Sequence, residues 1–200
     1  TRLRLSMEFL HTDSELTEDM VRDIEDMDAI LDQFLAFIRD GRDEPLEQLD
    51  LLELIREVVA PYNQKQEMVR LCLESVPAFP LRRVSLKRLL VNLIENALRY
   101  GGNAVEVAVS LSGDHSAPYV VLSVLDRGAG IDPAELGSIV NPFIRGDRAR
   151  GGQGAGLGLA IVKRIAALHG GSVELRNRSG GGLEARVCLP LGLLLPRDAV

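Results

Sequence analysis

Apolar residues in the first forty positions recur at alternating steps of three and four, the spacing of a heptad seam. The run "TRLRLSMEFL" carries the first part of this seam, and a longer run after the polar break "HTDSELTED" carries the rest. The pattern predicts two helices joined by a short turn, a helical hairpin over residues 1–40. The seam residues are Leu3, Met7, Leu10, Met20, Ile24, Met27, Leu31, Phe34 and Ile38.

Two helices cannot bury both halves of this seam by themselves. A second copy of the chain would complete a dimeric four-helix bundle, and this interpretation predicts a homodimer. The alternative is that the hairpin packs against the downstream part of the same chain. Because the chain begins abruptly inside a helical run, we expect it to be a piece of a longer protein and the hairpin to be truncated.

The pattern changes after residue 40. Residues 41–48 are polar, include Gly41 and Pro45, and predict a linker. Residues 49–192 mix helical and alternating periods, and residues 193–200 predict a loose tail. Helices are expected at 51–62, 85–100 and 156–171, and strands at 67–75, 103–112, 119–126, 171–177 and 182–190. This order predicts a two-layer α/β sandwich, so that the whole chain is of the α+β class.

The composition says more about which partners the chain can bind than about which fold it adopts. The chain is 46% hydrophobic with only 4% aromatic residues, so its core should be aliphatic. Its formal net charge of −6 argues against a nucleic-acid partner, because phosphate backbones attract basic surfaces. No apolar run approaches the ~20 residues of a membrane span, so we expect no membrane contact by this fragment.

The two cysteines stand in alternating apolar runs, "VRLCLES" and "ARVCLPL". These runs predict that Cys72 and Cys188 are buried in strands, in a reducing compartment. A disulfide is the less favoured alternative, and their spacing offers too few ligands for zinc.

The helix expected at 85–100 carries amides on the face opposite its apolar stripe. Asn92 and Asn96 lie four residues apart there, together with Glu95 and Arg99. Asparagine is a poor helix former, so this pair suggests a functional face. The carbonyl oxygen of Asn96 suits Mg²⁺, and the Arg99 guanidinium suits phosphate. The alternative is that these side chains simply meet solvent.

The segment "DRGAGID" follows an apolar strand. Asp126, at the end of that strand, can accept a hydrogen bond from an exocyclic amine such as that of adenine. Gly128 and Gly130 would let the backbone turn sharply and approach a flat ring. The alternative is an ordinary Asp–Gly turn.

The third candidate segment is a glycine-rich stretch that leads into a helix, "GGQGAGLGLAIVKRI". Glycines recur here at every second position from Gly152 to Gly158. Exposed N–H groups and the helix dipole make such an entry an anion site. No G-K-[ST] follows, which excludes a P-loop, and no strand leads directly into it, which excludes a Rossmann fingerprint. The irregular residues 132–153 before it predict a lid.

In their order along the chain, these segments resemble the motifs of the sensor histidine kinases. "NLIENALRY" is similar to their N box, "DRGAG" to their first glycine box, "NPFIRGD" to their F box and "GQGAGLGLAIV" to their second glycine box. The closest resemblance is to osmosensor kinases of the EnvZ type, and it covers nearly the whole chain, from "TRLRLSMEFL" to "GGLEARVCLPL".

The resemblance implies the ATP-binding fold shared with DNA gyrase and Hsp90, with ATP and Mg²⁺ as cofactors. Asn96 would hold the metal, Asp126 would contact the adenine amine, and the second glycine box would cradle phosphates. The implied ATP-binding residues are Asn92, Asn96, Ala97, Leu98, Arg99, Tyr100, Asp126, Gly128, Gly130, Ile131, Phe143, Arg145, Gly146, Gly154, Ala155, Gly156, Leu157, Gly158 and Leu159.

The residue type at position 92 distinguishes kinases from ATP-hydrolysing enzymes within this fold. The ATPases place a glutamate one turn before the metal-binding Asn, whereas this chain has an amide, which cannot act as a general base. Glu95 is near in sequence but should point differently. Two departures from the family are Ala155, where Thr is frequent, and Leu183, where a hydroxyl residue is frequent.

The chain contains no catalytic residue of its own under this interpretation. The match places the phosphoacceptor histidine upstream of Thr1, and His11, His115 and His169 are expected to be structural or solvent-exposed. The fragment should therefore bind nucleotide without autophosphorylating. The parent would pass the ATP γ-phosphoryl group to that histidine and then to an Asp of an OmpR-like response regulator, in the cytoplasmic portion of a bacterial inner-membrane protein. The rivals are an ATPase clamp of the same fold and a non-enzymatic dimerisation module.

Overall fold

The computed structural model describes residues 20, 21, 24, 27, 43–102, 104–113, 117–144 and 156–192. Most of the predicted hairpin and the whole predicted tail lie outside these residues. The four described hairpin positions are helical, and the seam residues Met20 and Met27 are exposed there.

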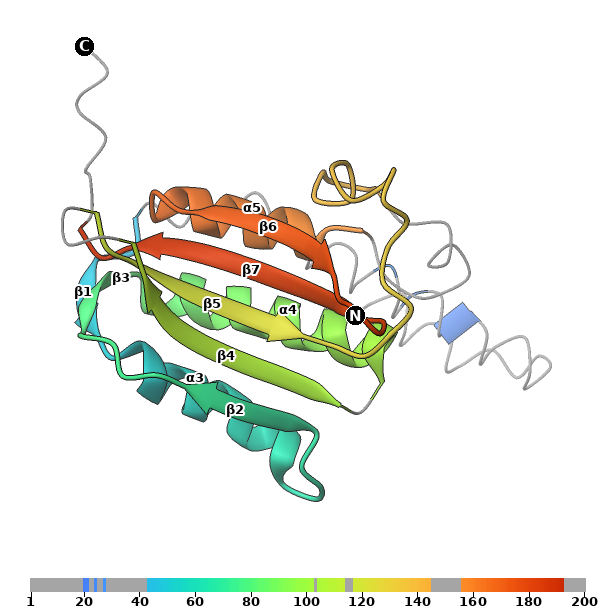
Figure 1. Ribbon diagram of the computed structural model, residues 1–200, viewed down its shortest axis with the longest axis horizontal. Helices are drawn as coiled ribbons and strands as arrows, with labels where there is room; N and C mark the ends of the chain where they lie inside the picture. Colours follow the sequence, from blue (N-terminus) through green and yellow to red (C-terminus); the bar gives the residue numbers. More distant parts are fainter. Residues whose placement is uncertain are drawn as a thin grey trace, which may run out of the picture.

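A five-stranded sheet forms one layer of the described fold (Figure 1). Its spatial order is β2-β4-β5-β7-β6, with β2 parallel to β4 and every other neighbouring pair antiparallel. The strands are β2 (Val69–Leu73), β4 (Val105–Ser112), β5 (Tyr119–Leu125), β6 (Ser172–Asn177) and β7 (Leu183–Pro190). All five overlap the predicted strands. Burial alternates along β4 and β7, whereas the central strand β5 is buried at five consecutive positions.

Three helices form the second layer on one face of the sheet (Figure 1). They are α3 (Leu51–Val59), extended by the 3₁₀ turn η1 (Ala60–Asn63), then α4 (Arg83–Gly101) and α5 (Gly158–Leu168). The aliphatic core lies between the layers and includes Leu54, Leu90 and Val107, each fully buried. The two-layer α/β sandwich is therefore confirmed.

A small second sheet was not predicted. Strands β1 (Glu47–Leu49) and β3 (Phe79–Leu81) pair antiparallel, with Leu49 opposite Phe79. Each has three residues, which is too short for a periodic signal. Strand β1 also begins inside the segment expected to be a linker, so the packed structure starts before residue 49.

Residue Glu44, in that same segment, binds the start of α4. Its carboxylate accepts hydrogen bonds from the backbone N–H of Val84 and of Ser85 and from the Ser85 hydroxyl, the last two at 3.0 and 2.6 Å. The first N–H groups of a helix have no partner within the helix, so a carboxylate there stabilises the helix start. Glu44 thus caps the helix that carries both asparagines.

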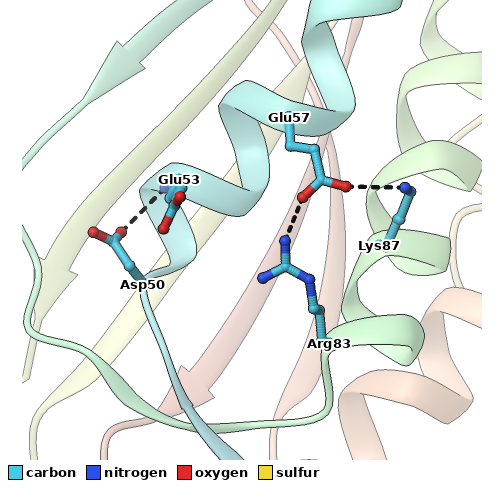
Figure 2. Close-up of polar contacts among 5 residues, drawn as sticks. All are labelled: Asp50, Glu53, Glu57, Arg83 and Lys87. Atoms are coloured by element: carbon cyan, nitrogen blue, oxygen red, sulfur yellow. Dashed lines mark hydrogen bonds and ion pairs between the residues drawn. The ribbon is translucent and has the colours of Figure 1, made fainter.

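Figure 2 shows how α3 is joined to α4 on the exposed side. Glu57 lies between Arg83 and Lys87 and pairs with both, with a distance of 3.0 Å to Lys87 Nζ. The hydrogen bond from Lys87, with the charges of both cations, lowers the pKa of Glu57. Asp50 caps α3 by accepting from the backbone N–H of Leu52 and Glu53, at 2.9 and 3.1 Å. Exposed ion pairs of this kind stabilise only weakly, so burial rather than charge holds the two helices together.

The prediction of buried cysteines was wrong, because neither side chain is fully buried. Cys72 is exposed and Cys188 is half-buried, and both thiols are free. In β2 the alternation directs Val69 to the core, so Cys72 lies with Arg70 on the outer face. The apolar run around Cys72 did not by itself reveal which of its two faces is buried.

His169 fulfils the structural role expected of it. It is 1% exposed, its Nε2 accepts from the backbone N–H of Arg82 at 3.0 Å, and its Nδ1 donates to the Ile165 carbonyl at 2.8 Å. This pairing needs a neutral ring with its proton on Nδ1. Burial is the main cause that lowers the pKa of His169 below the usual 6.5, and the Arg82 charge acts in the same direction.

We expect this histidine to make folding sensitive to acid. Because the folded-state pKa is lowered, the unfolded chain binds more protons below about pH 6.5, and stability falls as the pH decreases through that window. Chemical denaturation between pH 7.5 and 5 should show a steeper loss of unfolding free energy for the wild type than for His169→Gln. His11 and His115 are present in both proteins, so their contributions cancel. Equal slopes would contradict the buried, neutral state.

Candidate functional site

Asp126 is a buried carboxylate at the carboxyl end of β5. It is 5% exposed, and its Oδ1 accepts from the backbone N–H of Gly128 at 2.8 Å and of Leu183 at 3.1 Å. Its own backbone N–H donates to the Leu183 carbonyl at 2.9 Å, and its carbonyl accepts from Arg178 Nη1 at 2.6 Å. Within the described part of the chain, Oδ2 has no hydrogen-bond partner. The carboxylate is thus fixed with one oxygen left for a donor.

Glycines surround Asp126 because there is no room for side chains. A Cβ on Gly101 would lie 2.2 Å from Asp126 Cβ, and one on Gly182 would lie 2.1 Å from the Asp126 carbonyl oxygen. A Cβ on Gly128 would lie 2.3 Å from the carbonyl oxygen of Tyr100. The end of α4, the segment after β5 and the β6–β7 turn therefore meet at this residue.

Packing within the chain gives Gly128 and Gly130 a physical reason that the sequence did not show. Gly128 is needed for the contact with α4. Gly130 has φ +71°, and a Cβ on it would lie 2.5 Å from Oδ1 of Asn177. Both glycines are explained by packing within the chain itself.

The amide face of α4 lies beside the start of α5. Asn92 Nδ2 donates to the Arg88 carbonyl at 2.8 Å, and its Oδ1 would lie 3.3 Å from a Cβ on Gly158, the first residue of α5. Asn92 and Asn96 are half-buried, whereas Arg99 and Tyr100 are exposed. The structure thus brings the N box and the second glycine box together.

Glu95 lies on a different side of α4. Glu95 is exposed, and its charge contributes, after burial, to raising the pKa of Tyr62 in η1. On a helix each residue is rotated by about 100° from the one before it, which separates Glu95 from Asn96.

The base of the predicted lid contacts the glycine-rich stretch. The backbone N–H of Phe143 donates to the Gly156 carbonyl at 3.1 Å, and Phe143 itself is exposed with φ +63°. Helix α5 then begins with Leu157 as its N-cap, and no side chain caps it within the described residues. Its first N–H groups are therefore available to an anion. Arg145, Gly146, Gly154 and Ala155 lie outside the described residues.

Four of the remaining predicted residues differ in how far they are buried. Ala97, Leu157 and Leu159 belong to the core, with Leu157 fully buried, whereas Leu98 is half-buried. Their side chains hold α4 and α5 against the sheet. Any nucleotide contact by Leu157 would therefore come from its backbone.

The possible metal donor on α4 is an amide oxygen and not a cluster of carboxylates. Among the described residues, no group of three or more His, Cys, Asp or Glu could hold a metal ion. The Asn96 carbonyl fits Mg²⁺, because this ion commonly takes one or two protein oxygens and completes its shell with phosphates and waters. None of the helices in the described part of the chain is both long and apolar enough to cross a membrane.

Three contributions to the site were missed in the sequence. Asn177, Arg178 and Gly182 come from the β6–β7 turn, about fifty residues after Asp126. The triplet Gly180–Gly182 was the available signal, since consecutive glycines mark a backbone that must pass close to something.

Comparison with known proteins agrees with this arrangement. The family described as histidine kinase-, DNA gyrase B- and HSP90-like ATPase matches residues 82–193. The sensor histidine kinase GtrS of Pseudomonas aeruginosa is 39% identical over 96% of this chain, and the sensor protein kinase PmrB of the same species is 34% identical over 84%. This chain spans only 39% and 36% of the lengths of these two relatives.

Two solved structures extend the comparison to the fold. The histidine kinase domain of the E. coli osmosensor EnvZ is 32% identical, with a TM-score of 0.57 over 78% of this chain and 95% of that one. Full-length ShkA in complex with AMPPNP is 25% identical, with a TM-score of 0.68 over 95% of this chain and 42% of that one. The chain therefore belongs to the histidine kinase-, DNA gyrase B- and HSP90-like ATPase family, and it carries the ATP-binding catalytic domain of the sensor histidine kinases.

Proposed function

We propose that this chain positions Mg·ATP for phosphoryl transfer to a histidine outside the chain, and that the parent protein passes the group on to an Asp of an OmpR-like response regulator. Asp126 would accept the adenine amine, and the N–H groups at the start of α5 would bind phosphate. Asn96 would hold Mg²⁺, which neutralises phosphate charge when bound. Phosphoryl transfer depends mainly on such positioning and charge neutralisation.

The observation that carries this proposal is the environment of Asn92. Its amide is bonded to the Arg88 carbonyl and lies against Gly158, at the position where the ATPases of this fold place a glutamate. An amide cannot take a proton from water. Glu95 is exposed and is rotated by about 100° from Asn96 on the same helix. These contacts support transfer to a separate acceptor over hydrolysis, which disfavours the ATPase clamp.

The organisation of the whole protein is also a proposal. Residues 1–40 would form the truncated dimerisation hairpin, residues 41–48 the connection, 49–192 the catalytic domain and 193–200 a tail. The exposed seam residues Met20 and Met27 support a homodimer over packing on the same chain. The parent would be a bacterial inner-membrane sensor of the EnvZ type with this portion in the cytoplasm, and the similarity to the EnvZ domain supports that placement.

The metal role of Asn96 predicts a defect that depends on Mg²⁺. Replacing Asn96 with Ala removes one ligand oxygen, so the affinity for a non-hydrolysable ATP analogue with Mg²⁺ should fall about ten- to a hundredfold. Affinity measured in EDTA should change little. Isothermal titration calorimetry with and without Mg²⁺ gives both values, and Glu95→Gln on the same helix is the matched control. Full Mg²⁺-dependent affinity in Asn96→Ala would refute this role.

The kinase activity itself can be tested in trans. The chain is mixed with a dimerisation domain that carries the missing histidine, and ATP labelled at the γ-phosphate is added. We expect label on that histidine and none on this chain, with little release of free phosphate when the acceptor is left out. Rapid phosphate release without acceptor would favour the ATPase clamp. Absence of nucleotide binding in calorimetry would favour the non-enzymatic dimerisation module.

A further inference from the structure

The β6–β7 turn holds both ends of the segment that follows β5. Asn177, the last residue of β6, binds Ile131 twice: its Nδ2 donates to the Ile131 carbonyl at 2.6 Å, and its Oδ1 accepts from the Ile131 N–H at 2.9 Å. The next residue, Arg178, donates from Nη1 to the Asp126 carbonyl at 2.6 Å. Residues 126 and 131 bracket the whole first glycine box.

This pair of hydrogen bonds fixes the orientation of the Ile131 peptide groups as well as their position. Two hydrogen bonds to the N–H and C=O of one residue prevent its peptide planes from rotating, as a strand partner does in a sheet. Gly130 adopts φ +71° beside it, and a Cβ there would collide with the Asn177 amide. The glycine and the amide therefore form one interlocking unit.

We propose that Asn177 and Arg178 are positioning residues that set the base selectivity of the nucleotide site. This inference rests on the proposed function, in which Asp126 reads the purine. Adenine presents an amine at the position where guanine presents a carbonyl oxygen. A fixed carboxylate bonds the amine and repels the oxygen, whereas a carboxylate that can move away from guanine loses much of that discrimination.

Asn177 can be replaced without damage to the core. Its side chain belongs to an exposed residue at the end of an edge strand, whereas Asp126 is buried against Gly101 and Gly182. Asn177→Ala removes both bonds to Ile131. Asn177→Asp keeps the size and the acceptor oxygen but replaces the donor with an oxygen that faces the Ile131 carbonyl. Ser179→Ala, an exposed position in the same turn, is the matched control.

The test compares non-hydrolysable analogues of ATP and GTP, each with Mg²⁺, by calorimetry or competition. Both carry the same triphosphate, so the ratio of their affinities isolates the base. Since a hydrogen bond to a charged group is involved, we expect the ratio in Asn177→Ala and Asn177→Asp to fall about tenfold. Ser179→Ala should keep the wild-type ratio. Amide hydrogen exchange at Ile131, measured without nucleotide, should become faster in both Asn177 variants.

The remaining outcomes each contradict the inference in a recognisable way. An unchanged ratio with faster exchange at Ile131 would show that the contact exists but does not serve base recognition. Equal losses for both analogues would assign Asn177 to the site as a whole rather than to the base. If the wild type bound neither analogue, the proposed function would fail and this inference with it, while the exchange data would still report the contact itself.

Discussion

The carboxylate of Asp126 is the point at which three distant parts of the chain meet. The end of α4 approaches it through Gly101, the β6–β7 turn approaches through Gly182, and its own Oδ1 is held by two backbone N–H groups. A buried carboxylate is costly unless it is hydrogen-bonded, and the two bonds to Oδ1 offset part of that cost. The close approach of Gly101 to Asp126 places the end of α4 against the end of β5.

Helix α4 is held along its whole length. Glu44 caps its first turn, the backbone N–H of Arg82 just before it donates to the buried His169, and Gly101 closes its last turn against Asp126. Between these ends, Asn92 lies against Gly158. The asparagines therefore sit on a rigid element, which is what a site that must position phosphates requires. Because Glu44 belongs to the segment expected to be a linker, the connection to the hairpin contacts the same helix.

The sequence predicted the elements with clear periods and the residues that belong to local motifs. The three helices and five main strands were predicted from their apolar periods. The sequence singled out Asn92, Asn96 and Asp126 because their residue types are unusual at those positions, and their roles stay predictions. Strands β1 and β3 were missed because three residues carry no period. Asn177 and Arg178 were missed because their partners lie 46 and 52 positions away in the chain, and exposed polar residues at a turn give no signal of what they bind.

The glycines illustrate the limit of reading chemistry directly from a motif. Gly128 and Gly130 suggested a backbone that approaches a flat ligand, yet their neighbours are the Tyr100 carbonyl and the Asn177 amide. They allow parts of the protein to approach one another around Asp126. The N box, like these glycines, makes contacts within the protein itself. The Asn92 amide donates to its own helix and cannot accept a proton, which supports the proposal that the group receiving the phosphoryl lies outside the site.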